Sequence, residues 1–241
     1  MLLAALLWAA PVSTPTAHAP NTLPEKAQYG GASAPTVFLM HGILNKSVSM
    51  KRIERALERG GFEVVNLSYP SRSRTVEEHA AWLDEKVREK GRGELYFVGH
   101  SLGAIVIRYY LAVYNPPQAK RFLMITPPNR GSMLADTVDK TPLYKVVWGR
   151  KAGGELRASS EDFWKSLPPP PIEFAVLAGG LGNGKGFNPL IPGDDDGTLA
   201  VEETRLEGAA DFKVLPYQHT SIVLKKKTAE MAVRFLKGGR F

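Results

Sequence analysis

Six short apolar runs divide this chain, and segments with helical spacing of apolar residues lie between them. Each run is apolar at most consecutive positions, which is typical of a strand buried on both faces. The runs lie at residues 36–40, 63–69, 95–98, 121–126, 173–178 and 212–215. Repeated alternation of strand and helix predicts an α/β fold with a mostly parallel sheet of about six strands and helices on both faces.

Helical spacing follows four of these runs. The predicted helical segments are 50–57, 76–87, 104–114 and 229–236. Thr75 and Glu78 stand before the second segment in the capping-box pattern, in which each residue's side chain binds the other's backbone N–H. We therefore expect this helix to begin directly after Thr75.

The interval between the fourth and fifth runs, residues 133–171, interrupts the alternation. It combines weak helical patterns with aromatic residues such as Tyr144, Trp148 and Trp164, and it ends in four consecutive prolines. We interpret it as a small cap over the carboxyl edge of the sheet, where parallel sheets place their sites. The alternative is a surface excursion that packs on the core.

The amino-terminal segment has the composition of an export signal. Residues 1–10 read MLLAALLWAA, and Ala17-His18-Ala19 fits a cleavage site. We expect residues 1–19 to be a signal peptide, 20–35 a linker and 36–241 the folded domain, so that the protein is periplasmic or secreted. Because no positive charge precedes the apolar run, an uncleaved membrane anchor is the alternative.

Composition and charge limit the classes of function. The 241 residues are 44% hydrophobic and 23% charged and contain no cysteine, which fits one globular domain without disulfides. The net charge is +7, with basic clusters at residues 225–227 and in the carboxyl-terminal tail. Such clusters are either solvated helix faces or contacts to an anionic membrane surface. Nucleic acid is disfavoured, because no aromatic residues interleave with the basic ones.

Candidate chemistry centres on Gly99-His100-Ser101-Leu102-Gly103, which joins the apolar run 95–98 to the helical segment 104–114. A serine at a sharp turn between strand and helix presents its hydroxyl clear of both elements. Glycines on either side let the neighbouring backbones pack closely around that turn. Ser101 is therefore the candidate nucleophile.

A serine nucleophile needs a histidine base and an acid that orients the histidine. In the fold whose elbow this segment resembles, the acid and the histidine follow the serine, and His219 is the only histidine after Ser101. The acid is expected among Asp194, Asp195 and Asp196, and we select Asp196. The same cluster could instead be a plain acidic loop or a calcium site, although it lacks EF-hand spacing.

The oxyanion of an acyl-transfer intermediate needs two backbone donors. One is expected to be the N–H of Leu102, directly after the candidate nucleophile. The other is expected from the loop after the first strand, where Gly42 permits close approach and Ile43 supplies an N–H. His41 is interpreted as a structural residue of that loop.

Together, Phe38-Leu39-Met40-His41-Gly42, the Ser101 elbow, Asp196-Gly197 and His219 resemble the α/β-hydrolase superfamily, most closely its compact bacterial lipase and esterase branch. The resemblance implies a serine hydrolase that cleaves small-molecule or lipid esters through an acyl-enzyme, without metal or organic cofactor. An acyltransferase with the same residues, or an inactive binding protein with this fold, are the alternatives.

Overall fold

The computed structural model describes residues 34–139, 152–157 and 159–241. Six strands form one sheet in the order β2-β1-β3-β4-β5-β6, and every neighbouring pair is parallel. The strands are β1 (Thr36–Met40), β2 (Glu63–Leu67), β3 (Leu95–His100), β4 (Ala119–Ile125), β5 (Glu173–Gly179) and β6 (Asp211–Leu215). This topology confirms the predicted α/β fold and its strand count.

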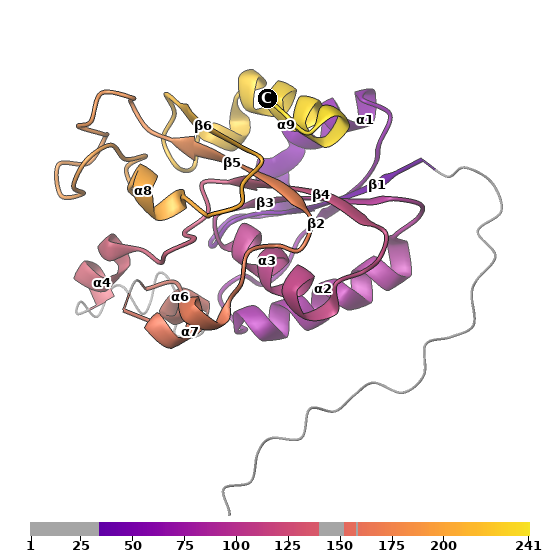
Figure 1. Cartoon of the computed structure of the whole chain (residues 1–241), viewed down its shortest axis with the longest axis horizontal. Coiled ribbons are helices and arrows are strands. Elements are labelled where there is room, and N and C mark those ends of the chain that lie inside the picture. The colour runs from indigo at the N-terminus through magenta and orange to yellow at the C-terminus, as the bar shows by residue number, and fades with distance from the viewer. Residues whose placement is uncertain (1–33, 140–151, 158) are drawn as a thin grey trace, which may run out of the picture. The chain divides into compact units, whose positions relative to one another are not determined.

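Helices cover both faces of the sheet (Figure 1). The long ones are α1 (Lys51–Arg59), α2 (Val76–Lys90), α3 (Leu102–Tyr114) and α9 (Lys226–Gly238). Short ones are η1 (Ser47–Met50), α4 (Met133–Asp139), α6 (Ala152–Glu155), α7 (Glu161–Ser166), α8 (Val201–Thr204) and η2 (Ile222–Leu224). Helices α2 and α3 pack together on one face, and α1 and α9 on the other.

Alternate residues of the strands supply two separate hydrophobic clusters, one on each face. In β1, Phe38 and Met40 belong to the cluster under α2 and α3, whereas Val37 and Leu39 belong to the cluster under α1 and α9. Because successive side chains of a strand point to opposite faces, a strand buried on both sides must be apolar throughout. The consecutive apolar positions that predicted these strands have this cause.

Helix α2 begins directly after Thr75, as predicted. The capping box is formed: the Thr75 side chain accepts from the N–H of Glu78, and the Glu78 carboxylate accepts from the N–H of Thr75.

The second strand ends at Leu67, earlier than the predicted residue 69. Tyr69 leaves the strand because its hydroxyl donates to the carbonyl of His41 at 2.7 Å and its ring stacks on the imidazole of His41.

The insertion between β4 and β5 is described only in part. Residues 140–151 and 158, which include Tyr144 and Trp148 of the predicted cap, lie outside the described residues. In the part that is described, Leu156 and Leu167 are buried in the cluster under α2 and α3. The cap over the carboxyl edge therefore stays a prediction, while the flanks of the insertion pack on the core.

The predicted signal peptide and residues 20–33 of the predicted linker also lie outside the described residues. Within the residues that are described, no helix combines the length and the apolar character needed to cross a membrane.

Candidate active site

Ser101 occupies a sharp turn between β3 and α3. Its backbone has φ 53° and ψ −124°, a conformation that side-chain-bearing residues rarely adopt. Close packing on both sides requires glycine, since a Cβ at Gly99 would lie 2.5 Å from the Cα of Ala104, and one at Gly103 2.5 Å from the carbonyl oxygen of Met40. The two elbow glycines thus allow the helix and the strands to meet around the turn that holds Ser101.

Three side chains from separate loops join in one hydrogen-bond chain. The hydroxyl oxygen of Ser101 lies 3.0 Å from Nε2 of His219, and Nδ1 of His219 lies 2.7 Å from Oδ2 of Asp196. Ser101 follows β3, Asp196 lies between β5 and α8, and His219 lies between β6 and η2. Parallel strands bring these loops to one edge of the sheet, so residues far apart in sequence meet there.

The hydrogen bonds of Asp196 define the tautomer of His219. Oδ1 of Asp196 accepts from the N–H groups of Thr198 and Leu199, and a carboxylate at Oδ2 can only accept. Nδ1 of His219 must therefore carry the proton that it donates to Asp196. Nε2 is left with a free lone pair directed at the Ser101 hydroxyl, which is the arrangement that a general base requires.

The three adjacent aspartates point to different partners. Asp194 accepts from the N–H groups of Leu181 and Gly182, and buried Asp195 accepts from those of Asn188 and Gly197. Asp195 and Asp196 are both buried, whereas Asp194 is half-buried. Backbone donors compensate the burial of each carboxylate.

The aspartates do not form a shared ligand set. Among residues 34–139, 152–157 and 159–241, no three His, Asp or Glu side chains gather closely enough to hold a metal ion.

His100 and Gly179 take part in the site in ways that the sequence did not reveal. Nε2 of His100 donates to the carbonyl of His219 at 2.9 Å, which ties the elbow to the loop that carries the histidine. Burial lowers the pKa of His100 to about 3, so the ring is neutral. A Cβ at Gly179 would lie 2.7 Å from the Cβ of Asp196. Gly179 at the end of β5 leaves room for Asp196, and a glycine at a predicted strand end is a feature that the sequence does show.

Both expected oxyanion donors are unused by the protein. Within the described part of the chain, the backbone N–H groups of Ile43 and Leu102 make no hydrogen bond. Gly42 lies against the elbow, since a Cβ there would come within 3.0 Å of the Cβ of Ser101. Leu44 follows with φ 61°, and its N–H donates to the Ser71 hydroxyl. The loop after β1 is therefore held against the elbow with a free donor on Ile43.

His41 is held inside this loop. Its Nδ1 donates to the carbonyl of Gly42 at 2.8 Å, and its ring stacks on Tyr69 with centroids 4.5 Å apart. Burial lowers its pKa below the ordinary value. The structure does not bring His41 into the hydrogen-bond chain of Ser101, in keeping with the structural role expected for it.

The comparisons with known proteins concern the fold of the chain. Residues 35–152, which include the elbow, match the sequence profile of the family described as alpha/beta hydrolase fold. The chain belongs to the α/β-hydrolase superfamily. No curated protein sequence matches this α/β-hydrolase significantly.

Solved structures of bacterial hydrolases share the fold of this α/β-hydrolase at low sequence identity. The mature lipase BlEst2 of Bacillus licheniformis is 20% identical with a TM-score of 0.67, covering 90% of this chain and 96% of the lipase. Phospholipase PlaB of Legionella pneumophila is 16% identical with a TM-score of 0.65, covering 86% of this chain and 60% of the phospholipase. Carboxylesterase CesB of Bacillus subtilis is 16% identical with a TM-score of 0.56, covering 88% and 86%.

Proposed function

We propose that this α/β-hydrolase is a serine esterase that cleaves carboxylic esters through an acyl-enzyme. The observation that carries the proposal is the hydrogen-bond chain from Ser101 through His219 to Asp196, with distances of 3.0 and 2.7 Å. In this mechanism the Ser101 oxygen attacks the ester carbonyl while Nε2 of His219 takes its proton. The N–H groups of Ile43 and Leu102 hold the oxyanion of the tetrahedral intermediate.

Collapse of that intermediate breaks the bond to the alkoxy group, and His219 returns the proton to the leaving alcohol. Water then attacks the acyl-enzyme, with His219 again as base, and releases the acid and free Ser101. Asp196 keeps its negative charge throughout and stabilises the imidazolium that forms in each half-reaction. Each residue acts with the atom that the geometry already directs toward its partner.

Apolar side chains near the site favour an ester with an apolar acyl group. Leu44 directly follows the Ile43 donor and is 50% exposed, and Met133 is exposed at the start of α4, the helix that follows β4. The structural likeness to a lipase, a phospholipase and a carboxylesterase supports an ester substrate without selecting one.

Hydrolysis of p-nitrophenyl esters from acetyl to palmitoyl tests this proposal. The wild-type chain should release p-nitrophenol, and Ser101→Ala should lose nearly all of that activity. A matched control is Ser49→Ala, since this serine lies in η1 on the surface and bonds only a neighbouring carbonyl. Full activity of Ser101→Ala would refute the proposal. Ester products that appear only with added glycerol or lysolipid would instead identify an acyltransferase.

We also propose that residues 1–19 direct export. Mass spectrometry of the chain recovered from the periplasm or medium should find the amino terminus at Pro20. An intact amino terminus in a membrane fraction would support the anchor instead.

A further inference from the structure

Several exposed apolar side chains follow the carboxyl ends of strands, the end of the sheet at which Ser101 lies. Large apolar residues exposed on loops or short elements after strand ends are Leu44, Val48, Met133, Leu181, Leu190 and Leu224. Val48 in η1 is 72% exposed and Leu224 in η2 is 52% exposed, and the two short helices contact each other. Single exposed apolar residues are ordinary, but a group at one edge marks a contact surface.

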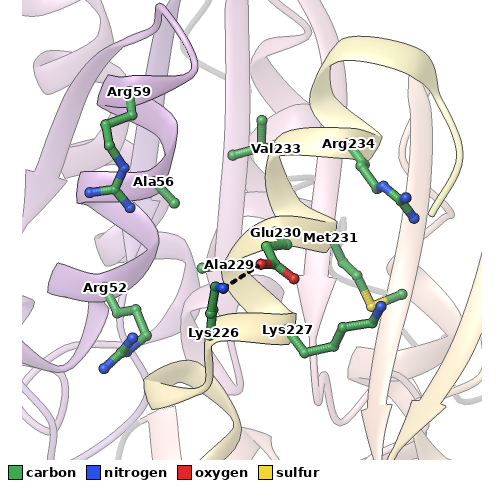
Figure 2. A pocket seen from close by; sticks show the side chains of 10 residues that line it. All are labelled: Arg52, Ala56, Arg59, Lys226, Lys227, Ala229, Glu230, Met231, Val233 and Arg234. Atoms are coloured by element: carbon green, nitrogen blue, oxygen red, sulfur yellow. Dashed lines mark ion pairs between the residues drawn. The ribbon is translucent and has the colours of Figure 1, made fainter.

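Basic side chains follow Val48 and Leu224 in the sequence, at the starts of α1 and α9. A cavity of about 520 Å³ opens between α1 and α9. Its charged lining residues are Arg52, Arg59, Lys226, Lys227, Arg234 and Glu230. Figure 2 shows Arg52 and Arg59 extending from α1 on one side of this groove and Lys226 from the start of α9 on the other.

The positive charge of the groove is largely uncompensated. Lys226 forms an ion pair with Glu230 at 3.5 Å. Among the residues that the structure describes, Arg52, Arg59, Lys227 and Arg234 have no ion pair. Like charges that face one groove repel each other, and an anionic partner relieves that repulsion. The groove is thus suited to a negatively charged surface.

The chain path places the basic groups shortly after the apolar ones. Helix α1 begins directly after η1, and α9 begins one residue after η2. Arg52, Lys226 and Lys227 therefore lie in first helical turns, two to four residues after the apolar residues Val48 and Leu224. Exposed apolar side chains followed closely by basic ones suit a membrane surface, where apolar groups meet the acyl chains and cations meet the lipid phosphates.

We propose that Val48, Leu224, Arg52, Lys226 and Lys227 form a docking surface for anionic phospholipid membranes. Val48 and Leu224 enter the head-group layer, and the three cations contact lipid phosphates. Since η1 follows the loop of Ile43 and η2 follows the loop of His219, docking in this orientation brings the candidate active site to the lipid. This inference goes beyond ester hydrolysis and requires only binding.

Vesicle co-sedimentation of the full chain with Ser101→Ala tests docking separately from activity. Vesicles contain phosphatidylcholine alone or mixed equally with phosphatidylglycerol. The apolar amino-terminal segment has no charged side chain before Glu25, and its contribution is the same in every variant compared below. We expect tighter binding to the anionic vesicles, weakened by added NaCl. Equal binding to both vesicle types would overturn the proposal.

A charge-matched pair of variants locates the surface. Arg52→Gln with Lys226→Gln and Lys227→Gln should bind anionic vesicles roughly 100-fold more weakly, because each cation near an anionic surface contributes about a fivefold factor. The control removes three charges at the opposite edge, where α2 ends and β4 begins, by Lys90→Gln, Arg92→Gln and Lys120→Gln. Equal losses in the two variants would refute the location.

A second pair tests the apolar part and does not depend on the charge variants. Val48→Ser with Leu224→Ser should weaken binding at least several-fold, whereas Val113→Ser, equally exposed at the end of α3, should not. Unchanged binding of the double variant would contradict insertion. Self-association of the chain that the same double variant abolishes, without vesicle binding, would assign the surface to a second copy and overturn the proposal.

Discussion

The replacement Asp196→Asn tests the proposed site through a proton whose position the structure defines. In the wild type, Oδ1 of Asp196 accepts from the N–H groups of Thr198 and Leu199 at 2.9 and 2.8 Å. An asparagine must place its amide oxygen at that position to keep both bonds. Its NH2 group then faces Nδ1 of His219. In the wild type, Nδ1 instead donates to the carboxylate of Asp196.

This reversal moves the proton of His219 to the wrong nitrogen. Nδ1 becomes the acceptor of the amide, so Nε2 carries the hydrogen and presents it to the Ser101 hydroxyl. Nε2 can then no longer take the serine's proton. Loss of the correct tautomer in such a triad lowers kcat by about 10³- to 10⁴-fold, which corresponds to about 4 to 5.5 kcal/mol of activation free energy.

The assay is kcat and KM for a short-chain p-nitrophenyl ester, with circular dichroism to verify folding. KM should change little, because Asp196 is buried behind His219 and does not reach the substrate. Asp194→Asn is the matched control and should stay within about threefold of the wild type, since its carboxylate bonds only the loop at Leu181 and Gly182. A kcat of Asp196→Asn close to the wild-type value would refute the reasoning.

Three further predictions concern the loop beside the elbow and the buried polar groups. Gly42→Ala should lower kcat about 10-fold or more, because its Cβ would meet Nδ1 of His100 at 2.9 Å and displace an oxyanion donor. Burial lowers the pKa of His79 to about 4, so the unfolded chain takes up a proton before the folded chain does as the pH falls. The free energy of urea unfolding should therefore fall between about pH 6.5 and pH 4 by up to about 1.4 kcal/mol per pH unit from this group, and His79→Leu should remove that share. Arg108→Leu should lower the free energy of unfolding by about 3 kcal/mol, since the buried guanidinium donates to three backbone carbonyls.

A specific result would contradict each of these three predictions. Gly238→Ala meets no atom within 4 Å and should keep full activity, so an equal loss in both glycine variants would remove the steric explanation for Gly42. A pH dependence of unfolding unchanged by His79→Leu would mean that this ring does not titrate as described. An Arg108→Leu chain as stable as the wild type would show that the three carbonyls find other donors.

The strands and the elbow could be predicted because their causes are local. Burial on both faces requires consecutive apolar residues, and the close approach of Met40 to Gly103 requires a residue without a side chain. Both requirements are visible in a few neighbouring positions. The earlier end of β2 was missed because it depends on the contact between Tyr69 and His41, which are 28 residues apart.

The partners of the site depend on contacts between distant loops and could be predicted only in part. Sequence spacing could not distinguish the three aspartates, because the backbone donors of the surrounding loop determine where each carboxylate points. The bond from His100 to the His219 carbonyl joins residues 119 positions apart, and no local pattern encodes it. The groove between α1 and α9 likewise exists only once both helices pack side by side.

Covalent trapping of the nucleophile tests whether Ser101 attacks the substrate. The chain is incubated with a p-nitrophenyl phosphonate ester, digested, and analysed by mass spectrometry. We expect one phosphonyl adduct on the peptide that contains Ser101, no adduct in Ser101→Ala, and much slower labelling in His219→Ala. No adduct in the wild type, or an adduct on another residue that persists in Ser101→Ala, would contradict the role of Ser101 as the nucleophile.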